Sequence, residues 1–247
     1  MRFRVLTILL GMLLYTTSTC MAGDWRVIPI KMFLGPQAKS GSVRLINNAK
    51  TPLNLQVTAK TWSQDSKGKD LYVETEDIVF FPRVMTVPPG KEQVLRAGIK
   101  IPATSTEKTY RLFIEEIPEA TRTGSASVTV AIRFGLPIFV APLEDKIATD
   151  ITLAELSNGI FSGEAINNGN VHFLPSRVTL SGKDSNGKEV FNDLLKPWYI
   201  LAGMARSYSY EFKPEQCRNL ATLRFEISDS THQLFRDIPV SGDQCSR

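Results

Sequence analysis

Few residues in this sequence of 247 amino acids have the types and spacing that catalysis needs. His172 and His232 lie in polar, turn-rich stretches, with no cysteine or third histidine nearby to complete a metal site. Glu115 and Glu116 are adjacent in an alternating segment, so as strand residues they point to opposite faces and cannot work as an acid and base pair. The sequence therefore predicts no catalytic residue, no metal site and no cofactor, and we interpret both histidines as surface residues.

A different kind of chemistry, backbone pairing between β-strands, is favoured by residues 125–142, SASVTVAIRFGLPIFVAP. Every second position on one side of this strand carries an apolar residue: Ala126, Val128, Val130, Ile132 and Phe134. The opposite side carries the cation Arg133. A long exposed strand of this kind adds readily to a sheet of another chain. The alternative is that these side chains pack into the protein's own core, as those of alternating strands usually do.

The first residues have the features of a secretory signal peptide. Two arginines precede an apolar run over residues 5–15, and small residues end at Ala22. We predict cleavage after Ala22, so that residues 1–22 are removed during export. A lipid-modified Cys20 is the alternative, which the preceding residues disfavour because the usual leucine is missing.

Removal of the signal would leave two cysteines, Cys217 and Cys245, in an oxidising compartment. We predict that they form a disulfide, which would stabilise the fold by about 3–4 kcal/mol on the chain-entropy estimate. Two free thiols are the alternative. Redox catalysis is disfavoured because the sequence has no Cys-x-x-Cys spacing.

The composition is that of a globular protein, with 43% hydrophobic residues. Without the two signal arginines the formal charge falls from +4 to +2, so the charge gives no reason to expect a nucleic-acid partner. Outside the signal, no segment approaches the roughly 20 apolar residues that a membrane-spanning helix needs. We therefore predict no membrane insertion.

Beyond the signal, short alternating segments are separated by turn signals about every eight to twelve residues, a pattern typical of β-sandwiches. We find no convincing helix and no internal repeat in the sequence. The alternation is interrupted after Pro142 by charged residues, and a second set of strand signals follows. The sequence therefore predicts an all-β fold of two immunoglobulin-like β-sandwich domains, over residues 23–142 and 143–247.

Several segments in this order resemble the periplasmic chaperones of the chaperone–usher pathway, which assemble pili and related surface fibres in Gram-negative bacteria. In the N-terminal half these are Phe81–Ile99, Thr109–Pro118 and Val130–Val140. In the C-terminal half, Asn167–Phe173 and Trp198–Gly203 are similar to the branch that assembles thin, archaic-type fibres. The resemblance covers essentially the whole chain after the signal.

The resemblance implies a non-enzymatic periplasmic protein, with its two sandwiches in an L-shaped arrangement around an interdomain cleft. In this family the last strand of the first domain fills the gap in an incomplete pilin sandwich, which is strand addition with alternate side chains inserted. Val128, Val130 and Ile132 would be inserted here, with Ala126 and Phe134 at the ends. The implied partners are pilin or fibre subunits, bound one-to-one, and an outer-membrane usher. Self-association of the free chaperone stays open.

Family chaperones also hold the C-terminal carboxylate of the subunit with two basic residues in the cleft. By resemblance the candidates are Arg111, Arg133 and Lys31; Lys31 stands near a position where better-known members carry arginine. Arginine grips a carboxylate through two parallel hydrogen bonds, whereas lysine offers a point charge. The alternative for each is a solvated strand cation or an ion-pair partner of Glu115 or Glu116.

Two other functions fit an exported two-domain sandwich. A secreted adhesin or carbohydrate-binding protein would carry an exposed aromatic cluster, for which Trp25, Trp62 and Trp198 are the available tryptophans. A fibre subunit would begin with an alternating extension and contain an incomplete sandwich, whereas this sequence fills two complete domains.

Overall fold

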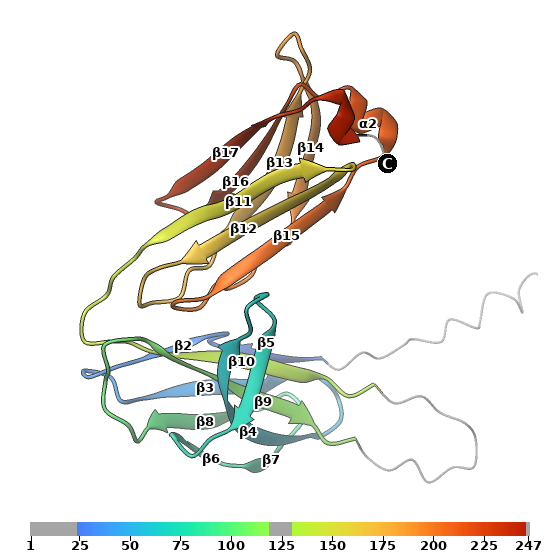
Figure 1. The fold of residues 1–247 in the computed structure, drawn as a ribbon. Helices are drawn as coiled ribbons and strands as arrows, with labels where there is room; N and C mark the ends of the chain where they lie inside the picture. The colour runs from blue at the N-terminus through green and yellow to red at the C-terminus, as the bar shows by residue number, and fades with distance from the viewer. Residues whose placement is uncertain (1–23, 119–129, 246–247) are drawn as a thin grey trace, which may run out of the picture.

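The protein folds into two β-sandwiches set at an angle to each other, as the computed structural model shows for residues 24–118 and 130–245 (Figure 1). Strands β1 to β10 form the first sandwich, and strands β11 to β17 form the second. The chain passes between them through residues 141–148, and the predicted domain boundary after Pro142 falls in this connection. The predicted all-β class with two immunoglobulin-like sandwiches is confirmed.

The first sandwich has two sheets. One sheet has the strand order β1 (Trp25–Ile28), β3 (Ser40–Asn47), β8 (Glu92–Ile99) and β6 (Ile78–Phe81). The other, which we call the β9–β10 sheet, has the order β2 (Met32–Leu34), β10 (Arg133–Val140), β9 (Lys108–Glu116), β4 (Leu53–Gln64) and β5 (Asp70–Glu74), and β7 (Val84–Val87) also pairs with β4.

Alternation along β9 and β10 builds the core between these sheets. Leu112 lies opposite Leu136 in the antiparallel register, and both are fully buried. Ile114 and Ile138, two residues further along their strands, are also fully buried, because side chains two apart share a face. The residues between them therefore point away from this core.

β10 has a free edge over most of its length. β2 runs parallel to β10 and pairs only with residues 138–140, while β1, from the same N-terminal segment, pairs with β3 in the other sheet. Among the described strands, residues 133–137 of β10 therefore pair with β9 alone. Such an edge offers unpaired N–H and C=O groups to an incoming strand.

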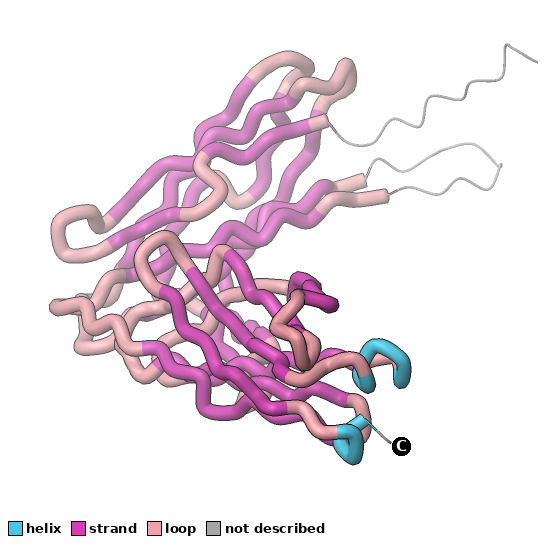
Figure 2. The backbone as a smooth tube through the Cα atoms, turned by 90° about the horizontal axis from the view of Figure 1, so that it is seen from above, coloured by secondary structure: helices cyan, strands magenta, loops and turns pink. Residues whose placement is uncertain are grey.

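The second sandwich also has two sheets, and strands dominate both sandwiches (Figure 2). One has the order β11 (Thr149–Ser157), β12 (Ile160–Asn167) and β15 (Ala205–Glu211). The other has the order β14 (Glu189–Leu195), β13 (Arg177–Lys183), β16 (Thr222–Ser228) and β17 (Gln233–Pro239).

Two short helices lie at the end of the second sandwich that is distant from the first (Figure 1): α2 (Pro214–Arg218) and η2 (Gly242–Cys245). The expectation of no helix is therefore wrong. Pro214 favours a helix start because its fixed φ suits the first helical position, and a single turn is too short to show helical periodicity. The helices carry Cys217 and Cys245, which are joined in a disulfide. Neither helix in the described ranges has the length and apolarity of a membrane span.

Candidate functional site

The outward face of the β9–β10 sheet carries the predicted cations. On β9, Arg111 lies between residues that point into the core, so its own side chain points outward. Arg111 pairs with Pro137 on β10, and Arg133 pairs with Glu115 on β9. Arg111 and Arg133 therefore share a face but are four residues apart along the sheet, or roughly 13 Å at the usual rise per residue. Their joint role as a carboxylate anchor stays a prediction.

Arg111 lies at the end of this face that the second sandwich covers. Arg111 is only 6% exposed, and its guanidinium carbon lies 3.8 Å from the centre of the Trp62 ring. Nη1 donates a hydrogen bond of 3.0 Å to the carbonyl of Gly135. Nε and Nη2 are buried and have no hydrogen-bond partner that meets ordinary geometry. One edge of the guanidinium is thus left unused.

The electrostatic surroundings of Arg111 do not neutralise it. No described carboxylate lies within ion-pair distance, and burial lowers the pKa of the guanidinium below its ordinary value. The hydroxyl groups of Tyr72 and Tyr199 and the carboxylate of Asp70 act in the opposite direction, because electron-rich oxygens near the guanidinium, including a side-chain hydrogen bond with Tyr72, favour its protonated form. A buried cation without a carboxylate partner is costly to fold, which makes Arg111 a candidate for binding an anionic group.

Arg133 lies at the other end of the sheet face. Its Nε is 3.9 Å from Oε2 of Glu115, and its guanidinium lies 4.0 Å from the centre of the Phe113 ring. Its side chain is 48% exposed. Of the alternatives considered for Arg133, the structure shows the ion pair with Glu115, which leaves its guanidinium accessible to solvent.

Lys31 lies closer to Arg111 than Arg133 does. It immediately precedes β2, whose Met32 pairs with Ile138, so one further step of the register places Lys31 beside Pro137, the residue paired with Arg111. The exposed Lys31 Nζ is 5.4 Å from the centre of the Phe33 ring on the same face. Two strand spacings separate Lys31 from Arg111, or about 10 Å between their backbones. Flexible side chains can converge over that distance.

The predicted donor residues lie partly outside the described chain. Ala126 and Val128 are not among the described residues. Val130 precedes β10 and is 77% exposed, and Ile132 also precedes β10, with its carbonyl accepting a hydrogen bond of 3.0 Å from the N–H of Glu116. Phe134 lies in β10 and packs against the first core. The apolar side of this segment therefore serves the protein's own core at one end and is uncovered at Val130.

An aromatic seam lies between the two sandwiches. Trp62, Phe139 and Leu201 form a small buried cluster, with Tyr199 packed against it. The rings of Trp62 and Tyr199 meet edge-on at 5.1 Å. The alternation of β4 and β10 predicts which way Trp62 and Phe139 point, but no sequence signal shows that Leu201 and Tyr199 cover them.

Polar contacts fasten the seam. Gln64 donates from Nε2 to the carbonyl of Tyr199 (2.9 Å) and accepts at Oε1 from the N–H of Leu201 (3.0 Å). The indole N–H of Trp198 donates to Asp70 (3.0 Å). Gly68, at the tip of the β4–β5 loop, is packed so closely against the second sandwich that an added Cβ would lie 2.9 Å from a backbone oxygen.

His172 belongs to the same seam, so its interpretation as a surface residue is wrong. Its ring stacks on Phe139 at 3.7 Å, and Nδ1 is 2.8 Å from the carboxylate of Glu107. Its side chain is only 17% exposed. The turn-rich sequence around it predicted exposure, whereas the packing of the second sandwich against the first decides its burial.

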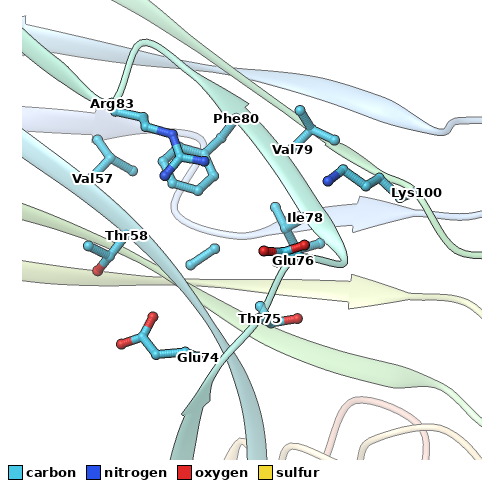
Figure 3. A pocket seen from close by; sticks show the side chains of 11 residues that line it. Val57, Thr58, Glu74, Thr75, Glu76, Ile78, Val79, Phe80, Arg83 and Lys100 are labelled. Atoms are coloured by element: carbon cyan, nitrogen blue, oxygen red, sulfur yellow. The ribbon is translucent and has the colours of Figure 1, made fainter.

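A concave pocket lies elsewhere on the first sandwich. It opens where β4 changes partners, because β7 pairs with residues 53–56 and β5 with residues 60–64. Glu74, Arg83 and Lys100 are among its lining side chains (Figure 3). Acids and bases are spread around it without a nucleophile and base pair, and none of the predicted site residues lines it. Within the described ranges no group of three or more potential ligands could hold a metal ion.

Comparison with known protein families gives a match for the first sandwich. Residues 27–145 match the pili and flagellar-assembly chaperone family, PapD N-terminal domain. A search of curated proteins found no match.

Solved structures share the fold of the whole two-domain unit. The chaperone–tip adhesion subunit complex CsuC–CsuE, from archaic chaperone–usher Csu pili of Acinetobacter baumannii, matches with a TM-score of 0.60 at 19% identity, over 87% of this chain and 98% of that one. The complex of the SafA pilin with the SafB chaperone from Salmonella enterica matches with a TM-score of 0.58 at 11% identity, over 88% and 98%. The CupB2 chaperone of Pseudomonas aeruginosa matches with a TM-score of 0.52 at 16% identity, over 85% and 97%.

Proposed function

We propose that this chain, whose residues 27–145 match the family of pili and flagellar-assembly chaperones, is a periplasmic chaperone for pilin or fibre subunits. It binds one subunit at a time by adding a strand to the subunit's incomplete sandwich, keeps the subunit soluble, and delivers it to an outer-membrane usher. It does so without catalysis. The observation that carries the proposal is a buried arginine with an unused hydrogen-bonding edge, Arg111, next to a strand with a free edge, β10.

In this proposal the residues of the free edge have separate tasks. Val128, Val130 and Ile132 enter the groove of the subunit, with Ala126 and Phe134 at the ends. Phe134 is already packed in the chaperone's core, so it fixes the base of the donated strand. Each aliphatic side chain that becomes fully buried contributes about 1.5–3 kcal/mol, which exceeds the roughly 0.5–1.5 kcal/mol that ordering a side chain costs.

Arg111 holds the C-terminal carboxylate of the subunit. Lys31 is the preferred second cation because it immediately precedes β2, whose first residue pairs with Ile138, next to the residue of β10 that pairs with Arg111. Arg133, which is occupied with Glu115 and lies further along the sheet, is the weaker candidate. The adhesin alternative is not favoured, because the aromatic cluster around Trp62 is buried in the seam instead of exposed.

The first test is recovery of a subunit from the periplasm. Each small exported protein encoded beside the chaperone is co-expressed with it, and the co-purified partner is identified. We expect Arg111→Ala to abolish recovery, while Arg236→Ala, which removes an exposed arginine of the second sandwich, leaves it unchanged. Normal recovery with Arg111→Ala would contradict the anchor assignment.

The second test addresses strand donation. Val130→Asp places a charge on the donated face and should prevent co-purification, because a carboxylate cannot enter an apolar groove without a large desolvation cost. Val190→Asp, at an exposed valine of β14, is the matched control. If subunits still co-purify with the Val130 variant, donation through this face is wrong.

A further inference from the structure

The guanidinium of Arg111 is enclosed by aromatic rings from both sandwiches. Trp62 of the first sandwich lies 3.8 Å from the guanidinium carbon, and the ring centres of Tyr199 and Trp198 of the second lie 5.6 Å and 5.8 Å from it. Nε and Nη2 are both inaccessible to solvent in this arrangement. A carboxylate cannot reach them unless one of the surrounding groups moves.

The part of this enclosure contributed by the second sandwich consists of two partly buried side chains, Trp198 and Tyr199. Trp198 donates a hydrogen bond to Asp70, and the ring of Tyr199 meets that of Trp62 edge-on. The next two residues are anchored more firmly, because Ile200 forms a β-bridge with Phe173 and Leu201 is buried against Trp62 and Phe139. Trp62 itself is buried in β4, which has a strand on each side. Of the groups that cover Arg111 from the two sandwiches, the side chains of Trp198 and Tyr199 are therefore the ones that can swing aside.

We propose that Trp198 and Tyr199 form a displaceable cap over Arg111, and that a carboxylate-terminated strand opens the cap when it binds. The identity of this ligand rests on the proposed chaperone function. The cap keeps the unpaired guanidinium away from small anions in the free protein. It also links the capture of a subunit to the contact between the two sandwiches.

The chemistry of the guanidinium supports an exchange of this kind. Because Nη1 is occupied by the carbonyl of Gly135, the free edge is Nε with Nη2. Two adjacent N–H groups of arginine match the two oxygens of a carboxylate, and such charge-assisted hydrogen bonds are stronger than neutral ones. The incoming carboxylate thus replaces an aromatic contact with paired hydrogen bonds at Nε and Nη2 of the guanidinium.

The cap is tested without a subunit by chemical modification with phenylglyoxal, a reagent selective for arginine. Peptide mass spectrometry gives the rate at Arg111, with the exposed Arg133 as internal reference. We expect slow modification of Arg111 in the wild type. In Tyr199→Ala the rate at Arg111 should rise about two- to tenfold, which corresponds to the loss of one aromatic pair.

Matched variants separate a cap from a general loosening of the fold. Tyr199→Phe keeps the ring and should retain the slow rate. Phe235→Ala, at an exposed aromatic residue of β17, should leave Arg111 unchanged. Gln64→Ala removes two of the fastening hydrogen bonds and should also speed the reaction. Equal rates at Arg111 in the wild type, Tyr199→Ala and Gln64→Ala would overturn the cap.

The opening is tested by hydrogen exchange on the chaperone with a co-expressed fibre subunit bound. The N–H of Leu201, which donates to Gln64 in the free protein, should exchange faster in the complex. The N–H of Ile200, which donates to the carbonyl of Phe173 within the second sandwich, serves as the internal reference and should be unchanged. Slower or unchanged exchange at Leu201 would overturn the displacement. The modification experiment needs no subunit, so the proposed function can fail while the cap stands, and the cap can fail while subunits are still captured.

Discussion

In each sandwich one strand ends in a buried asparagine with the same set of hydrogen bonds. Asn47 ends β3 and Asn167 ends β12, and each is 1% exposed. In both, Nδ2 donates to two backbone carbonyls: those of residues 51 and 87 for Asn47, and of residues 171 and 200 for Asn167. In both, Oδ1 accepts from the N–H two residues on. Each asparagine thus ties three backbone groups of the surrounding loops to the core.

The two sandwiches differ in their cross-linking and in the polar groups that they leave unpaired. The second is cross-linked by the Cys217–Cys245 disulfide. The first, over residues 23–142, has no cysteine. Among its described residues, no strand pairs with the outer edge of β10 over residues 133–137, and no carboxylate forms an ion pair with the buried Arg111. The shared asparagine indicates common architecture, and the departures from it lie where we propose that the subunit binds. The following changes test this comparison.

The disulfide should give the largest effect. Replacing Cys217 and Cys245 together by serine opens a link across 28 residues and should lower the free energy of unfolding of the second sandwich by about 3–4 kcal/mol. Chemical denaturation followed by circular dichroism measures this. Reduction of the wild type should reproduce the loss. An unchanged denaturation midpoint would show that the cross-link does not contribute as the comparison assumes.

Substitution of either asparagine should lower the free energy of unfolding by a similar, smaller amount. Asn47→Ala and Asn167→Ala each leave three backbone groups without their partner, which we expect to cost about 2–3 kcal/mol. Denaturation of the two variants under the same conditions checks this. A large loss for one and none for the other would mean that the two strand ends are alike in geometry only.

The seam is tested at Gly68, whose φ is 75° and whose Cβ would meet the second sandwich. Gly68→Ala should destabilise by about 1–2 kcal/mol from the left-handed backbone alone, and by more from the clash. Gly90→Ala is the control, because Gly90 has a φ of 65° but nothing near its Cβ. If both variants lose the same stability, the packing at the seam contributes nothing.

Substitution of Arg111 should change the free energy of unfolding in the opposite direction. Arg111→Met keeps the length of the side chain and removes an unpaired buried charge, so stability should stay equal or rise by about 1 kcal/mol, while subunit capture is lost. Arg224→Met removes an exposed arginine paired with Asp237 and should cost less than about 1 kcal/mol. Thermal unfolding compares the two. A strong loss of stability in Arg111→Met would assign that residue a structural role.

The Arg224–Asp237 pair also gives a small pH effect in the second sandwich. The hydrogen bonds from Arg224 lower the pKa of Asp237 below its ordinary 3.8. The ion pair's contribution to the free energy of unfolding is therefore complete above the ordinary pKa of 3.8. It is lost as the pH falls through the lowered pKa of the folded state. Asp237→Asn should be slightly less stable than the wild type at neutral pH, by less than about 1 kcal/mol because both groups are exposed. Unfolding measured against pH should show this gap closing below pH 4; a constant gap would contradict it.

Much of the fold could be predicted from the sequence, because the alternation of apolar and polar residues that marks a strand is visible within a few consecutive positions. The buried faces of β9 and β10 follow from their own patterns. The equivalence of Asn47 and Asn167 was missed, since three matching residues, Ile-Asn-Asn, are too few to be found as a repeat.

The sequence by itself determined the strands, the two-sandwich class and the outward direction of Arg111 and Arg133. Only the tertiary structure decided that Arg111 is buried and Arg133 exposed. The reason is that the cover over Arg111 comes from Trp198 and Tyr199, and contacts such as that of Gln64 with Tyr199 join residues 135 positions apart. Periodicity carries no information over that distance, so burial at a domain seam depends on how the finished sandwiches pack.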